Sequence, residues 1–178
     1  MWSAPVTTAP ATGEPVDREE VKTYLRVDGT SMDDQIDRFL SAARVQVEKT
    51  TSTKLLEQTV RARADSFADL EQLPIGPVSA VTEIKYLDTA GAEQILDSGS
   101  YELFGDHLEV GLRPAIGMTW PQIRPVRAAI AVTMTVGYGD AAALPEDIWL
   151  AIARLVRGML DDAPADVDDL LVNNRIWL

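Results

Sequence analysis

The sequence predicts an α+β protein: a helical core of two N-terminal helices and one C-terminal helix, with an inserted antiparallel β region and extended termini. Near both ends of the chain, apolar residues recur with a period of about 3.6 residues, as on one face of a helix. Between residues 54 and 140 they instead alternate with polar residues, which is typical of half-buried strands. Because the two patterns are segregated along the chain, we expect an antiparallel arrangement and not the alternating units of a parallel sheet.

Residues 1–16 are rich in proline, threonine and alanine and show no apolar period. This composition predicts a flexible arm that becomes ordered on a partner. Trp2 is the only aromatic residue of the arm. It is either an anchor for that partner or a chance occurrence, and the sequence leaves both readings open.

Residues 17–53 form the first part of the expected helical core. Asp17 is the predicted N-cap of the first helix and Ser31 that of the second, because each is followed by an acidic residue three positions later. The second helix has a regular apolar stripe at Ile36, Phe39, Leu40, Ala43 and Val47.

The inserted β region covers residues 54–140. Strands are expected at residues 55–65, 78–87, 93–96, 101–104, 107–112 and 128–136. The last strand shows the clearest alternation, and the short glycine-containing loop at 88–92 predicts a hairpin.

Residues 141–161 are the second part of the helical core, with Pro145 in the first turn of its helix. Residues 162–178 follow as an acidic spacer and a C-terminal tail. The tail is apolar and aromatic, whereas chain ends are usually polar. Either it folds back onto its own core or it docks into a cleft of another protein, with tryptophan and arginine as the interface anchors.

Composition excludes several classes of protein. Sixteen Lys and Arg against 28 Asp and Glu give a net charge of −12, which argues against a protein that coats DNA through its phosphates. The absence of cysteine excludes disulfide frameworks and thiolate sites, and a single histidine, His107, excludes mechanisms that need two imidazoles. We therefore expect no catalytic residue, no cofactor and no metal.

No apolar run approaches the roughly 20 residues that span a bilayer. The first residues also lack the basic start and apolar core of a signal peptide. We expect a soluble protein that is made inside the cell and does not contact a membrane.

Motifs that could carry chemistry have simpler explanations. The segment DGTSMDD at 28–34 lacks the ligand spacing of a calcium loop, and GYGD at 137–140 lacks the lysine of a phosphate-binding loop. Five arginines form a local basic strip, or else they lie on a solvated strand face or make salt bridges between subunits: Arg61, Arg63, Arg113, Arg124 and Arg127.

Several segments, taken in order, resemble phage head–tail connector (adaptor) proteins. The opening VKTYLRVD at 21–28, DDQIDRFLSAAR at 33–44 and LLEQT at 55–59 resemble the start of that family. Other segments resemble its branch with a β insertion, found in tailed phages, prophages and gene transfer agents. These are LPIGPVSAVTEIKYLD at 73–88, TWP at 119–121, VGYGD at 136–140 and LPEDI at 144–148.

The resemblance implies a structural subunit, not an enzyme. Such subunits form a ring, expected to be a dodecamer, under the portal vertex at the head–tail junction of the virion. The ring extends the DNA channel, lets DNA pass without specific binding, and links the portal to a stopper or tail-terminator protein. By analogy with relatives, the portal contact falls on Val172, Asn173, Asn174, Arg175, Ile176, Trp177 and Leu178.

Two alternatives remain at the level of the sequence. One is a small soluble hydrolase that uses a pair of carboxylates, which requires a pocket with acids of raised pKa. The other is an adaptor for a cellular partner that forms no ring.

Overall fold

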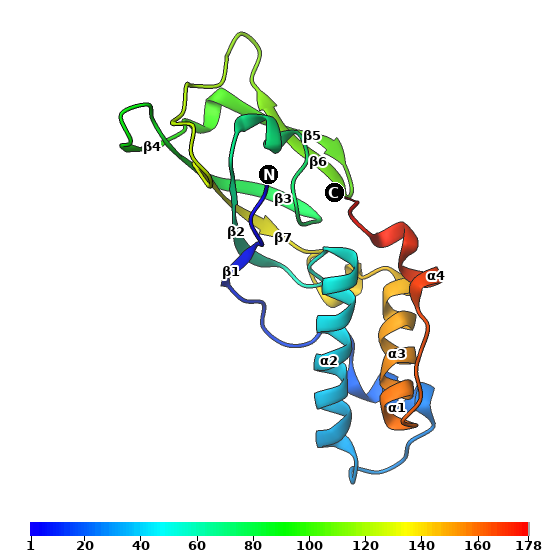
Figure 1. Cartoon of the computed structure of the whole chain (residues 1–178). Coiled ribbons are helices and arrows are strands. Elements are labelled where there is room, and N and C mark those ends of the chain that lie inside the picture. The colour runs from blue at the N-terminus through cyan, green and yellow to red at the C-terminus, as the bar shows by residue number, and fades with distance from the viewer. Residues whose placement is uncertain (178) are drawn as a thin grey trace. The chain divides into compact units, whose positions relative to one another are not determined.

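The computed structural model describes residues 1–177, and the chain divides into two compact units. The β unit comprises Met1–Ala11, Glu57–Gly137 and the chain from Ile176 onward. The helical unit comprises Thr12–Leu56 and Tyr138–Arg175. Helices and antiparallel strands are thus segregated, which confirms the predicted α+β class (Figure 1).

The helical unit contains α1 (Arg18–Leu25), α2 (Asp33–Thr51), α3 (Glu146–Leu160) and the short α4 (Asp168–Leu171). Asp17 caps α1 as predicted, because its carboxylate accepts hydrogen bonds from the amides of Glu19 and Glu20 at 2.8 and 3.2 Å. The prediction for Ser31 is wrong. Met32 precedes α2 without a side-chain cap, and the amide of Asp33 donates to the carbonyl of Thr30 at 3.3 Å instead.

The apolar stripe of α2 faces α3, and the two helices run side by side in Figure 1. Ile36 and Val47 of α2 are fully buried together with Ile148 and Ile152 of α3. Phe39 is partly buried against the same cluster. This cluster is the core of the helical unit, and it matches the predicted periodicity.

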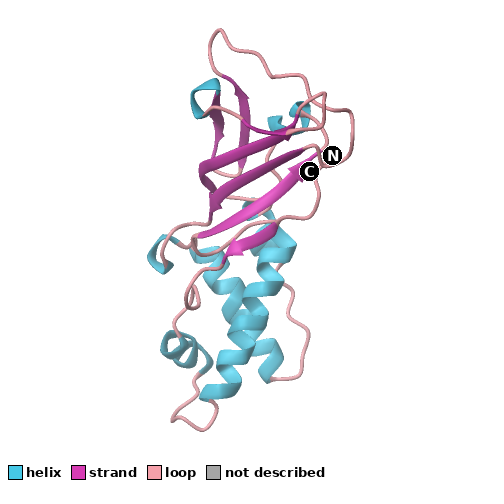
Figure 2. Ribbon diagram, turned by 90° about the vertical axis from the view of Figure 1, so that its left-hand side faces the viewer, coloured by secondary structure: helices cyan, strands magenta, loops and turns pink. Residues whose placement is uncertain are grey.

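The β unit is built on an antiparallel five-stranded sheet and a two-stranded hairpin (Figure 2). In spatial order the large sheet contains β1 (Val6–Ala9), β2 (Gln58–Ala64), β7 (Ile130–Val136), β3 (Val78–Leu87) and β4 (Glu93–Ile95). The hairpin consists of β5 (Tyr101–Asp106) and β6 (Glu109–Pro114). β7 therefore lies at the centre of the sheet, although it is the last strand in the chain.

The register places the predicted apolar residues on one face of the sheet. Val132 of β7 pairs with Ala62 on one side and with Ile84 on the other, and all three are buried. A 3₁₀ turn at Phe67–Glu71, which the sequence pattern did not indicate, adds Phe67 to this core. The Phe67 ring stacks on Trp120, with centroids 4.6 Å apart.

The N-terminal segment differs from the flexible arm that its composition predicts. β1 pairs with β2, and Trp2 forms an isolated bridge with Ala64. All four side chains of β1 are exposed, so the strand has no apolar alternation to reveal it and depends on backbone pairing alone.

The segment after α3 is also more ordered than an acidic spacer would suggest. Val167 and Leu171 are buried in the core of the helical unit, and a 3₁₀ turn at Val172–Asn174 follows α4. The neighbouring acidic side chains, Asp166, Asp168 and Asp169, are exposed. None of the helices among residues 1–177 has the length and apolar character needed to cross a bilayer.

Candidate docking surfaces

Among the described residues, no acid has the displaced, raised pKa that the hydrolase alternative predicts. In the part of the chain that the structure describes, the acids with displaced pKa values are Asp33, Asp69 and Asp88, and all three pKa values are lowered. A general acid needs a raised pKa instead. Residues 1–177 also contain no cluster of three or more potential metal-binding side chains.

The best-defined charged group of the helical unit has a structural role. The buried ammonium of Lys22 donates to Asp33 at 2.8 Å and to Glu19 at 3.2 Å. Arg18 lies 3.6 Å from the other oxygen of Asp33. The hydrogen bond from Lys22 lowers the pKa of Asp33 and raises that of Lys22. The group joins α1 to the start of α2.

This network predicts acid sensitivity of the helical unit. Because the pKa of Asp33 is lower in the folded chain than in the unfolded chain (about 3.9), its stabilising effect is complete above that unfolded value. The effect is lost as the pH falls through the folded pKa. We expect Asp33→Asn to lower the melting temperature at pH 7, with the difference from the parent shrinking below about pH 4.

Thermal melts between pH 7 and pH 2.5 measure this convergence. Asp34→Asn is the matched control, since Asp34 is the exposed neighbour in the same helical turn. A difference for Asp33→Asn that stays constant down to pH 2.5 would contradict the proposed role of its charge.

The part of the tail that belongs to the helical unit is only partly available for docking. Val172 and Asn173 are exposed, with Val172 exposed by 49%. Asn174 is buried, and its amide donates to the carbonyl of Leu170 at 3.5 Å. Arg175 is half-buried and pairs with Asp168 at 3.5 Å.

The part of the tail that belongs to the β unit contains one covered and one exposed apolar side chain. Ile176 is 6% exposed, and its Cδ1 lies 3.3 Å from the position that a Cβ on Gly76 would occupy. Trp177 is 64% exposed, while its carbonyl accepts a hydrogen bond from Gln72 at 2.8 Å. Leu178 lies outside the described residues. Ile176 therefore folds back onto its own chain, which was the first alternative for the tail. Trp177, in contrast, is mostly exposed.

Trp2 contacts its own chain. Its indole N–H lies 3.0 Å from the carbonyl of Asp69 and 2.9 Å from that of Gln72, and the half-buried ring packs against the core of the β unit. In this structure the anchoring site of Trp2 is thus the 3₁₀ turn at Phe67–Glu71 and the residue that follows it.

The five arginines are distributed over different elements. Arg61 and Arg63 are exposed on β2, in the large sheet. Arg113 belongs to the hairpin, where it pairs with Glu102 at 2.7 Å and lies over the ring of Phe104. Arg124 and Arg127 are exposed in the connection between β6 and β7. Exposure fits a solvated face for four of the five, whereas the salt bridge of Arg113 lies within its own chain.

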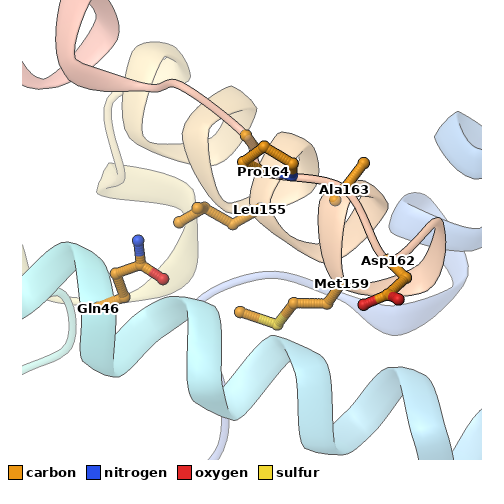
Figure 3. A pocket seen from close by; sticks show the side chains of 8 residues that line it. Gln46, Leu155, Met159, Asp162, Ala163 and Pro164 are labelled. Atoms are coloured by element: carbon orange, nitrogen blue, oxygen red, sulfur yellow. The ribbon is translucent and has the colours of Figure 1, made fainter.

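A groove in the helical unit was not predicted. It consists of two hollows, of about 520 and 470 Å³, that share four lining residues from α2, α3 and the segment after α3: Gln46, Leu155, Pro164 and Ala165. Figure 3 shows Leu155 and Met159 between α2 and that segment. The close approach of the segment requires Gly158, since a Cβ there would lie 2.6 Å from the carbonyl oxygen of Ala163. No local pattern reveals such a groove, because α2 is distant in the sequence from α3 and the segment that follows it.

Residues 18–95 match the family model of the phage gp6-like head-tail connector protein. This match confirms, for residues 18–95, the predicted resemblance to head–tail connectors.

Solved structures with the same fold agree with this family. The chain is similar to a chain in the neck of a native gene transfer agent (GTA) particle computed with C12 symmetry. The identity is 27% and the TM-score 0.73, over 100% of this chain and 96% of that one. It also shares its fold with chains from the neck of an empty GTA particle computed with C6 symmetry and from the virion of a native GTA particle. These have 22% and 24% identity, each with a TM-score of 0.77 over 99% of this chain and 97% of the other. No curated protein matches the sequence.

Proposed function

We propose that the protein is a subunit of a ring at the head–tail junction of a tailed phage or gene transfer agent. The observation that carries the proposal is the fold match over essentially the whole chain to proteins in GTA particle necks. The C12 symmetry of one of these necks supports a ring of about twelve copies. A ring of this kind is closed by head-to-tail contacts between two different surfaces of each subunit.

In this position the ring extends the DNA channel and links the portal to a stopper or tail-terminator protein. The net charge of −12 per subunit suits a channel wall along which DNA slides, because acidic side chains repel phosphates at short range. The protein is expected to be made in the host cytoplasm before it joins the particle. The adaptor for a cellular partner without a ring is the competing proposal, and no feature of the structure favours it.

We further propose that the C-terminal tail, residues 172–178, contacts the portal. Val172 and Trp177 are its exposed apolar anchors. Arg175 is proposed to leave Asp168 and to pair with a carboxylate of the portal. The loss of the pair with Asp168 should cost little free energy, because the two groups are 3.5 Å apart and the Asp168 side chain is 78% exposed. Ile176 is proposed to hold the tail on the β unit and so to fix the position of the exposed Trp177.

Particles produced without this protein test the proposal. We expect capsids with a portal but without the annular layer below it, and without attached tails, in electron micrographs. Complementation with the intact chain should restore the layer, and averaging of the restored necks should place the chain in a ring. A neck of normal composition and appearance in the absence of the protein would refute the proposal.

A further inference from the structure

The connection between β6 and β7 carries an exposed apolar tip, which we call the finger (residues 115–119). Trp120, stacked on Phe67, holds the connection on the β unit. The amide of Met118 donates to the carbonyl of Ala115 at 2.8 Å and so closes a turn at the tip. Ile116 is 98% exposed and Met118 51% exposed. Ile116 and Met118 together give the finger an exposed apolar tip, whereas a single exposed aliphatic side chain would be ordinary.

The surroundings of the finger in the sequence are basic in an otherwise acidic protein. Residues 110–139 contain no Asp or Glu but include Arg113, Arg124 and Arg127. Arg124 and Arg127 are exposed. The connection between β6 and β7 therefore combines the apolar tip of the finger with two exposed arginines, and it fits an apolar groove with an acidic rim.

The groove of the helical unit has this complementary character. Leu155, Met159 and Pro164 line it with apolar atoms. The carboxylates of Asp162 and Asp166 stand on its rim and are exposed. The volume of each hollow lies within the usual range of ligand pockets, which is large enough for a small group of side chains.

We propose that the finger of one copy of the chain inserts into the groove of the next copy. These two different surfaces of the same chain are complementary in charge and in polarity. A contact between two different surfaces is heterologous, and repetition of such a contact closes a ring or extends a filament. The inference rests on the proposed ring and names the surfaces that would join its subunits. Opposite charges at the rim favour fast and specific encounter, so the contact should weaken as the salt concentration rises.

Cysteine cross-linking tests the contact directly, because the chain has no native cysteine. One preparation carries Ile116→Cys, at the tip of the finger, and the other carries Gln46→Cys, at the exposed edge of the groove. After mixing and treatment with a short bismaleimide, we expect a covalent dimer of the two variants. Val45→Cys replaces Gln46→Cys as the matched control, since Val45 is the adjacent exposed residue on α2 and does not line either hollow. The same pairs are co-expressed and cross-linked in particles, where the subunits are assembled.

Substitution of the tip provides a second measurement. Ile116→Asp should reduce self-association of the purified chain by about tenfold or more, as is typical for an apolar anchor at the centre of an interface. Its melting temperature should not change, because the side chain is exposed. Ile95→Asp, at another exposed isoleucine, on β4 and 66% exposed, should leave self-association unchanged.

The outcomes separate this contact from the proposed function. If the protein is present in particle necks but the Ile116→Cys and Gln46→Cys pair links no better than the control in particles and in solution, the contact is refuted and the ring proposal stands. A finger cysteine that links only to the portal or to another neck protein assigns the finger to that partner and also refutes the contact. If the pair links in solution while the protein is absent from particles, the contact holds and the proposed function fails.

Discussion

Replacement of Trp177 by alanine should detach the protein from the portal while leaving both units folded. Trp177 is 64% exposed, so its ring contributes little to the stability of the free chain. If it is a central anchor of the portal contact, its removal should weaken binding by about tenfold or more. Co-purification with a tagged portal protein, at several protein concentrations, measures this loss.

Ile95→Ala is the matched control, because Ile95 is an aliphatic residue with a similar exposed fraction of 66% elsewhere on the β unit. It should co-purify with the portal as the parent does. If Trp177→Ala also co-purifies unchanged, with an unchanged melting temperature, the proposed tail contact is incorrect.

Replacement of Ile152 by alanine should have the largest effect on folding. Ile152 is 1% exposed and lies in the core of the helical unit between α2 and α3. Loss of a buried aliphatic side chain of this size usually costs about 2–5 kcal/mol, against a total stability of about 5–15 kcal/mol for a typical domain. Denaturant titration followed by circular dichroism should show the shift.

The same variant tests whether the helical unit unfolds as one cooperative body. We propose that it does, and hydrogen exchange should then show reduced protection throughout α2 and α3. Val45→Ala, at an exposed position of α2, should change stability by less than about 0.5 kcal/mol. Reduced protection confined to the turn around Ile152 would argue against cooperative unfolding.

Periodicity predicted the elements whose side chains pack on one face. The stripe of α2 and the alternation of β7 both follow from contacts that repeat along a single segment, so the sequence carries them locally. The Asp17 cap was predictable for the same reason, since a cap and its amides are neighbours in the chain.

Other elements depend on partners that are distant in the sequence. β1 has no buried face and forms because β2 offers it an open edge. α4 is four residues long, and it is stabilised by Leu171 in the core of the helical unit. The groove behind Pro164 needs α2, α3 and the later segment together, so no pattern within one of them indicates it.

The tail is a further case in which the sequence alone does not predict which side chains are buried. Its apolar composition predicted burial against some surface, and composition alone does not distinguish Ile176, which contacts its own chain, from Trp177, which faces solvent. That distinction requires the position of Gly76, about a hundred residues earlier in the sequence.

The central position of β7 also determines when the protein can fold during its synthesis on the ribosome. β2 and β3 each pair with β7, so the nascent sheet lacks its middle until residue 136 has left the exit tunnel. The helical unit must likewise wait for α3, which ends at Leu160 in a chain of 178 residues. Neither core can therefore close before its last element, β7 or α3, has been made, and a product terminated before β7 would offer unpaired strands to proteases.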